Sequence, residues 1–208
     1  MIDTFVISFT TFFATVGPID VAGVFAVLTA TTATRTRRIM ALRGTAIATA
    51  VLLIFALCGN FLLTRLGISL PALKVAGGIL LLLMSIDMVF VRNSGGTSTT
   101  LEEKDEASTK VDISVFPLAT PLIAGPGAMG AAILLMAKFE GDVFSKGIVL
   151  AGMLTVMLLT LFMLLLAETV PKLLGLTGMH VITRVFGVLL SALAVQFIFD
   201  GISASGVF

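Results

Sequence analysis

The sequence has few charged residues, no tryptophan, no tyrosine, a single cysteine and a single histidine. Only 12% of its 208 residues are charged, whereas soluble domains carry about 25%, so half of the usual polar surface is missing. Cys58 alone cannot form an intrachain disulfide or a CxxC redox pair. His180 alone excludes a multi-histidine metal centre. With a net charge of +1, the chain has no general affinity for nucleic acids.

Long apolar stretches take the place of this polar surface. Apolar residues make up 58% of the chain, and several charge-free stretches have roughly the 20 residues that a helix needs to cross a bilayer. Backbone groups in lipid must be bonded within the segment, so these stretches are expected to be helices. The sequence predicts an all-α integral membrane protein of the inner or cytoplasmic membrane, with six transmembrane helices at 4–29, 41–64, 69–91, 113–137, 147–170 and 180–200.

The two halves of the chain share a pattern of sequence motifs. A polar cytoplasmic linker over 92–112 separates a first unit of three predicted helices, 1–91, from a second, 113–208. Gly17-Pro18 recurs 108 positions later as Gly125-Pro126, and the Lys74–Gly77 motif recurs 110 positions later as Arg184–Gly187. Because three is odd, the second unit must cross the membrane in the opposite direction. The sequence therefore predicts a 3+3 inverted-topology repeat.

The distribution of lysine and arginine predicts the orientation. Nine of them flank the first connection, the linker and the fifth connection, and four lie on the opposite side. Since cytoplasmic loops are enriched in these residues, the first connection is expected in the cytoplasm and both termini outside.

Each Gly-Pro pair lies inside an apolar stretch and is expected to break its helix, because proline removes a backbone donor. The half-helix that restarts at each proline exposes unpaired N–H groups with partial positive charge, which suit a carboxylate. Two kinked helices in a bundle are the simpler alternative, but interrupted helices in matching positions indicate a transporter's binding site. The residues expected to surround the substrate are Thr15, Gly17, Pro18, Asp20, Thr120, Gly125, Pro126, Gly127 and Ala128.

Asp20 distinguishes the two breaks, because its counterpart is the neutral Ala128. The carboxylate could cap the restarted half-helix, where the helix dipole favours negative charge. Alternatively, it could attract the ammonium group of a substrate or carry a coupling proton, since ionisable residues within membranes are functional candidates. Backbone carbonyls freed at a break could instead hold a coupling Na⁺. No cofactor and no resident metal are expected.

Other polar residues are assigned structural roles. Lys74 and Arg184 are expected to extend to the membrane surface. Asn60 and Gln196 are expected to connect helices, and His180 lies beside a helix end. Asp87, Glu168 and Asp200 lie near helix ends. No nucleophile or metal motif supports an enzyme. A channel or a non-transporting accessory membrane protein remains the alternative, although neither a charged ring nor a filter sequence is present.

The chain resembles the MarC family of small bacterial and archaeal membrane proteins, which includes the SnatA-like transporters. The resemblance covers nearly the whole chain and rests on 12–18, the basic first connection, 76–81 with the following 86–88, and most strongly the run 117–128. It implies six membrane spans and the movement of small neutral amino acids such as glycine and alanine.

One position departs from the family pattern. The family commonly has Asn-Pro-x-Gly or Asp-Pro-x-Gly at the first break, whereas this chain has Gly17-Pro18-Ile19-Asp20. Glycine and alanine around the second break leave room near the backbone, which suits a small zwitterionic amino acid. We therefore expect a secondary transporter that works by alternating access. No pattern in the sequence sets its direction, its coupling ion or its oligomeric state.

Overall fold

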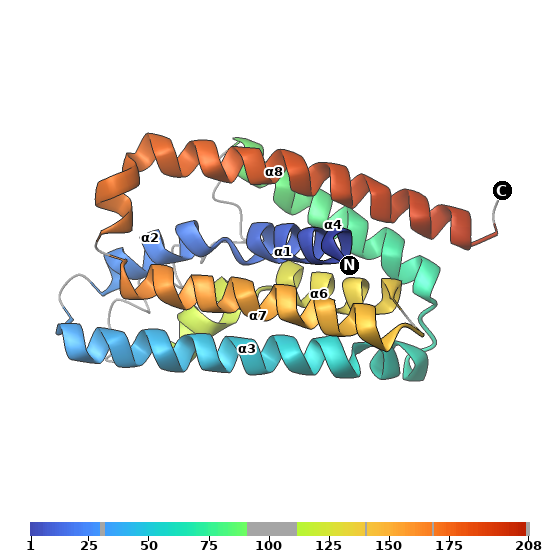
Figure 1. The fold of residues 1–208 in the computed structure, drawn as a ribbon, viewed down its shortest axis with the longest axis horizontal. Helices are drawn as coiled ribbons and strands as arrows, with labels where there is room; N and C mark the ends of the chain where they lie inside the picture. Colours follow the sequence, from blue (N-terminus) through green and yellow to red (C-terminus); the bar gives the residue numbers. More distant parts are fainter. Residues whose placement is uncertain (30–31, 91–111, 140, 168, 207–208) are drawn as a thin grey trace.

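The computed structural model describes residues 1–29, 32–90, 112–139, 141–167 and 169–206. Within these residues every regular element is helical, and no strand is present (Figure 1). The elements in chain order are α1 (Ile2–Val16), α2 (Pro18–Leu28), α3 (Thr34–Arg65), α4 (Leu70–Phe90), η1 (Ser114–Ile123), α6 (Pro126–Lys138), α7 (Val143–Leu165) and α8 (Val170–Ala204). The predicted linker, apart from Asp112, lies outside the described residues.

Five segments of the described chain are long and apolar enough to cross a membrane: Ile2–Leu28, Thr34–Gly59, Pro71–Phe90, Val143–Leu165 and His180–Ala204. The bent pair of η1 and α6, which meet at 55°, makes a sixth if it counts as one span. The prediction of an all-helical membrane protein is therefore confirmed at this level. Large apolar side chains such as Leu57, Leu83 and Leu158 are exposed on the outside, where lipid tails would contact them.

Two helices begin earlier than the apolar pattern predicts. Helix α3 begins at Thr34, seven residues before the predicted start. The element α8 begins at Val170, ten residues before the predicted start, but its backbone leaves the helical conformation at Gly175, where φ is 63° and ψ is 172°. Helix propensity explains the early start of α3. Arginine is a good helix former, so a helix can extend through this polar segment beyond the apolar stretch. Arg35, Arg37 and Arg38 consequently lie on the first turns of α3 rather than in a loop.

Gly17 separates α1 from α2. Its backbone has φ 61° and ψ 58°, a left-handed conformation that only glycine adopts without a steric penalty. The Gly17 N–H donates to the Phe13 carbonyl at 3.0 Å and ends α1. Pro18 then begins α2 as its first residue, a position where the missing N–H costs no hydrogen bond. The sequence Gly-Pro thus ends one helix and begins the next within a single residue.

The segment before the second Gly-Pro pair is less regular than predicted. The sequence predicts a helix from 113 that is interrupted at Gly125-Pro126. In the structure η1 consists of wide turns, and Phe116 and Thr120 have extended backbone angles. Each of these residues precedes a proline, Pro117 or Pro121, and proline disfavours the helical conformation of the residue before it. The first part of this span is therefore not an ordinary α-helix.

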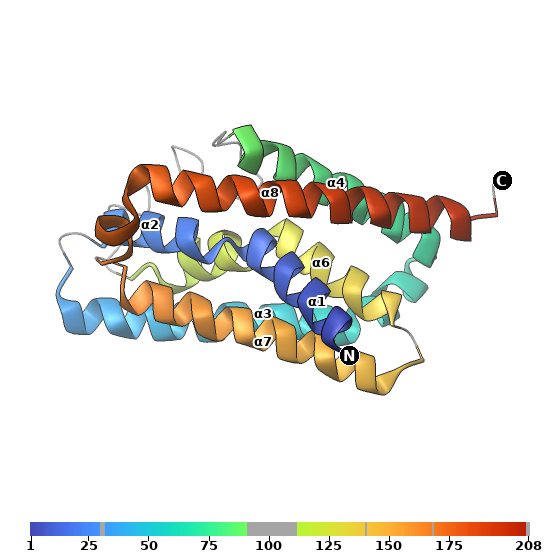
Figure 2. The ribbon, with the colours of Figure 1, turned by 45° about the horizontal axis from the view of Figure 1, so that its top comes forward.

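Helices α4 and α8 run antiparallel and pack along each other, as both views show (Figures 1 and 2). Three glycines permit the close approach. A Cβ atom on Gly78 would lie 2.8 Å from the Ala194 carbonyl oxygen, one on Gly187 would lie 3.2 Å from that of Ser85, and one on Gly201 would lie 2.9 Å from that of Pro71. Small residues of this kind are typical of tightly packed helix pairs in membranes.

We expect Gly78→Ala to destabilise the protein by about 1–3 kcal/mol, because the added methyl group overlaps a neighbouring backbone and cannot be accommodated by a rotamer change. Gly147→Ala is the matched control, since a Cβ atom at this position on α7 meets nothing within 4 Å. The control should be neutral or stabilising by up to about 1 kcal/mol. Thermal unfolding of the detergent-purified variants measures both. Equal melting temperatures would contradict the tight α4–α8 contact.

Asp142 caps the start of α7 outside the membrane span. Its carboxylate accepts hydrogen bonds from the Ser145 hydroxyl and from the backbone N–H groups of Ser145 and Phe144. These bonds, the one from the Ser145 side chain first, lower the pKa of Asp142 from its usual value of 3.8.

A group whose pKa is lowered by folding stabilises the folded state above its unfolded pKa and loses that effect as the pH falls. We therefore expect Asp142→Ala to lower the melting temperature at neutral pH, and the difference from the original chain to shrink below about pH 4. Melting curves across a pH series test this. A difference that stays constant over the whole series would show that the carboxylate charge contributes nothing.

Candidate functional site

The start of α2 places a carboxylate against a distant part of the chain. The Thr183 hydroxyl on α8 donates to the Asp20 carboxylate, at 3.1 Å from Oδ1 and 3.2 Å from Oδ2. His180, one turn earlier on α8, also interacts electrostatically with Asp20. The rings of Phe13 and Phe186 contact each other with centroids 4.1 Å apart and planes tilted by 37°, which brings α1 against the same helix. Asp20 therefore connects the first interruption to α8.

The start of α6 offers unpaired backbone donors. Gly125 precedes it in an extended conformation, with φ −80° and ψ 169°, and no side chain caps the helix. The first backbone bond runs from the Met129 N–H to the Gly125 carbonyl at 3.0 Å. The residues Gly127 and Ala128 come before Met129 in the helix. Their backbone N–H groups are among the first ones of a helix, which have no carbonyl partner within it. Gly127 and Ala128 are both buried, whereas Pro126 is exposed.

A methionine from a neighbouring helix covers this start. A Cβ atom on Gly127 would overlap the Sδ atom of Met84, and the side chain of Met84 on α4 is 6% exposed. The absence of a side chain at Gly127 is therefore what allows the thioether to lie against the backbone. The sequence alone offers no reason to predict Met84 as a site residue, because a methionine in an apolar helix is typical of a hydrophobic core.

The two predicted threonines have different surroundings. The Thr15 hydroxyl donates to the Thr11 carbonyl within α1 at 2.8 Å, and its side chain is buried. Thr120 lies in extended backbone within η1 and is partly exposed. The only proton of the Thr15 hydroxyl is thus used inside its own helix, so toward a ligand this hydroxyl offers acceptor capacity.

Thr183 was not among the predicted site residues. It stands just before the Arg184–Gly187 motif, and no local pattern marks it; only the fold brings it to Asp20. Gln196 was predicted to connect two helices. In the structure its amide instead donates to the Asp200 carboxylate on the same helix, at 2.7 Å. Arg184 is exposed, and Lys74 and Asp87 are partly buried. The side chain of Asn60 and the whole of Glu168 lie outside the described part.

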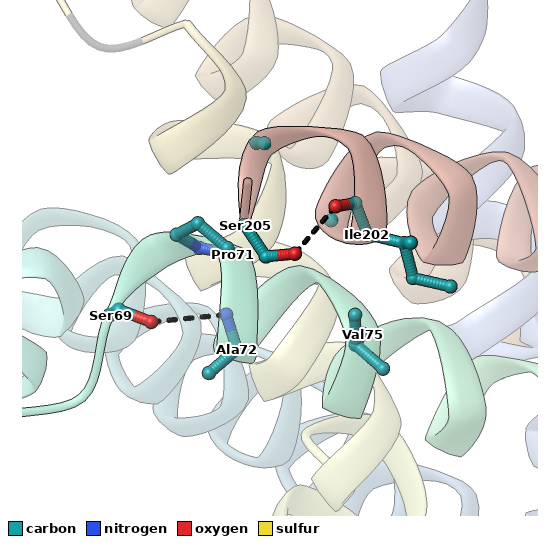
Figure 3. A pocket seen from close by; sticks show the side chains of 8 residues that line it. Ser69, Pro71, Ala72, Val75, Ile202 and Ser205 are labelled. Carbon is teal, nitrogen blue, oxygen red and sulfur yellow. Dashed lines mark hydrogen bonds between the residues drawn. The ribbon is translucent and has the colours of Figure 1, made fainter. Parts of the chain in front are cut away.

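An open groove of about 550 Å³ lies between the beginning of α4 and the end of α8 (Figure 3). It is lined by Ser69, Pro71, Ala72, Val75, Gly201, Ile202, Ala204 and Ser205. Its two side-chain hydroxyl groups already have partners, since Ser69 accepts from the Ala72 N–H and Ser205 donates to the Ile202 carbonyl. At 1.5 Å per helical residue, the groove lies about 27 Å along α8 from Thr183. It is therefore separate from the predicted site.

The apolar helices and their exposed apolar surface define a multi-pass integral membrane protein. The sequence profile described as "MarC family integral membrane protein" matches residues 2–205. The chain therefore belongs to the MarC family.

Curated relatives extend over nearly the same length. The UPF0056 membrane protein MJ1677 of Methanocaldococcus jannaschii is 40% identical over 200 residues, which cover 95% of each chain. The UPF0056 membrane protein YhcE of Escherichia coli is 32% identical over 197 residues, which cover 94% of this chain and 89% of the relative. These names state a membrane protein and no activity. No solved structure is significantly similar to the chain.

Proposed function

We propose that the protein is a secondary transporter that moves small neutral amino acids, such as glycine and alanine, by alternating access. The substrate binds between the interruptions at Gly17 and Gly125. Its carboxylate meets the α6 start, and its ammonium group lies toward Asp20. The observation that carries this proposal is the uncapped α6 start at Gly127, because a helix start with free N–H groups favours an anion.

The packing of the helices supports the inverted repeat on which this mechanism depends. α1 and α2 pack on α7, and η1 and α6 pack on α3. Likewise α2 contacts α8, and α6 contacts α4. The repeat equates α1 with η1, α2 with α6, α3 with α7 and α4 with α8. Each contact above therefore becomes its partner contact when the two units are exchanged. Corresponding helices also run in opposite directions (Figure 1), as an inverted repeat requires.

Two matching glycines support the same symmetry in detail. Gly44 on α3 lies so close to η1 that a Cβ atom would be 3.0 Å from the Ser114 carbonyl oxygen. Gly152 on α7, 108 positions later in the sequence, lies against α1, where a Cβ atom would be 2.9 Å from the Cβ of Ser8. Close backbone approach therefore recurs at equivalent points of both units.

The interrupted helices are neighbours, since α1 contacts α6 and α2 contacts η1. A ligand between them would meet N–H groups from one unit and the Asp20 carboxylate from the other. Asp20 is also our candidate for a coupling proton, while carbonyls of the irregular η1 are the candidates for Na⁺. The charge distribution favours an orientation in the inner or cytoplasmic membrane with the arginine-rich start of α3 in the cytoplasm and both termini outside.

Counterflow in proteoliposomes tests the proposal. Vesicles loaded with unlabelled glycine should accumulate labelled glycine or alanine in a saturable manner, and protein-free vesicles should not. Repeating the assay across a pH series, with and without Na⁺, identifies the coupling ion. If the protein exchanges no small amino acid, the proposed function is wrong. Ion conductance across planar bilayers would then test the alternative of a channel.

A further inference from the structure

The positions of Met84 and Gly127 have counterparts in the repeat at which the sizes of the residues are reversed. At the offset that relates the two breaks, Gly127 corresponds to Ile19. At the offset that relates α4 to α8, Met84 corresponds to Ala194. Half-helix α2 therefore carries a large residue and packs on α8, which carries a small one at the matching position. Half-helix α6 carries a glycine and packs on α4, which carries the large methionine. All four side-chain positions are buried.

This reversal makes the two helix starts unequal. At the α2 start the bulky group is Ile19 itself, a β-branched side chain attached to the half-helix and restricted in its rotamers. At the α6 start the bulky group is Met84, which reaches in from α4 on a flexible, unbranched chain. Rotation of Met84 can uncover the Gly127 backbone, whereas Ile19 remains attached to its own helix start.

We propose that Met84 is the residue that limits substrate size at the α6 start: its thioether covers the backbone of Gly127 and moves aside when a small amino acid binds. This inference rests on the proposed function and adds a determinant of specificity to it. In the bound state the displaced side chain lies beside the substrate, because it cannot leave the packed contact between α4 and α6. A glycine or alanine side chain then fits, and a larger one collides with Met84.

Competition for glycine counterflow tests this proposal with the full chain. Unlabelled glycine, alanine, valine and leucine compete with labelled glycine for exchange by the original protein, Met84→Ala and the milder Met84→Val. The matched control is Met88→Ala, a buried methionine one turn later on α4 whose Cβ lies against Gly187 of α8 instead of the α6 start. Melting temperatures of all variants show that each is folded.

We expect Met84→Ala to raise the competition by valine and leucine, relative to alanine, by about tenfold or more, the discrimination that a single methylene in an apolar pocket provides. Met84→Val should give an intermediate shift, and Met88→Ala none. An unchanged ratio in folded Met84→Ala, or an equal shift in Met88→Ala, would overturn the assignment of Met84 while glycine exchange by the original protein still supports the transporter. Absence of glycine exchange in the original protein would instead overturn the proposed function itself.

Discussion

Substitution of Gly127 by leucine is expected to abolish amino acid exchange. The new side chain would occupy the place where Met84 now meets the backbone and would keep a carboxylate away from the N–H groups of Gly127 and Ala128. Hydrogen bonds to a charged group contribute about 1.5–3 kcal/mol each, and every 1.4 kcal/mol corresponds to about a tenfold change in affinity. Loss of both bonds therefore predicts at least a hundredfold decrease, which counterflow of labelled glycine would register as no exchange.

Gly130→Leu is the control for this experiment. It lies one turn further along α6, and a Cβ atom there meets nothing within 4 Å. Gly127→Ala combined with Met84→Ala provides a second control, because the added methyl group then takes space vacated by the thioether. A melting temperature close to that of the original protein shows that a variant is folded. A folded Gly127→Leu protein that exchanges glycine at the original rate would remove the α6 start from the substrate site.

Substitution of Asp20 by asparagine is expected to have the second largest effect. Asparagine keeps an oxygen that can accept the Thr183 hydroxyl proton but removes the negative charge. If the charge attracts the substrate ammonium group or carries a coupling proton, exchange should fall by about tenfold or more, as expected for the loss of one charge-assisted bond. The remaining exchange should also lose its dependence on pH. Counterflow across a pH series measures both.

Two further variants separate the roles at this position. Thr183→Val removes the hydrogen bond to Asp20 and keeps the carboxylate, so it should reduce exchange less than Asp20→Asn does. His180→Gln removes the imidazole that interacts with Asp20 from the same helix. Normal exchange by Asp20→Asn with an unchanged pH profile would leave Asp20 with a role in stabilising the α2 start only.

Local sequence signals predict much of this architecture. The apolar lengths locate the spans, and the Gly-Pro pair locates the interruption at Gly17, because a left-handed residue followed by proline has a strong steric signature. The same rules could have predicted the extended residues Phe116 and Thr120, since each precedes a proline. The helix start at Thr34 could not be read from hydropathy, because its arginine-rich first turns are helical without being apolar.

Contacts between helices that are distant in the sequence could not be predicted from it. The pairing of Asp20 with Thr183 joins residues 163 positions apart, and nothing in the composition around Thr183 marks it. Met84 meets Gly127 only because α4 packs on α6. The sequence identifies residues with unusual backbone or charge, such as Gly127 and Asp20. Their partners are set by the register of one helix against another, which hydrophobic periodicity leaves undetermined.

The glycine contacts between α4 and α8 have a mechanical consequence. Each half of the chain contributes one helix to this pair, and the backbones touch at Gly78, Gly187 and Gly201. Sliding or separating them would open voids in a densely packed contact, which is energetically unfavourable. We therefore expect the pair to move as one rigid unit that both halves share. In the transport cycle proposed above, changes of access between the two sides of the membrane would then come from movement of the other helices, the interrupted ones included, relative to this pair.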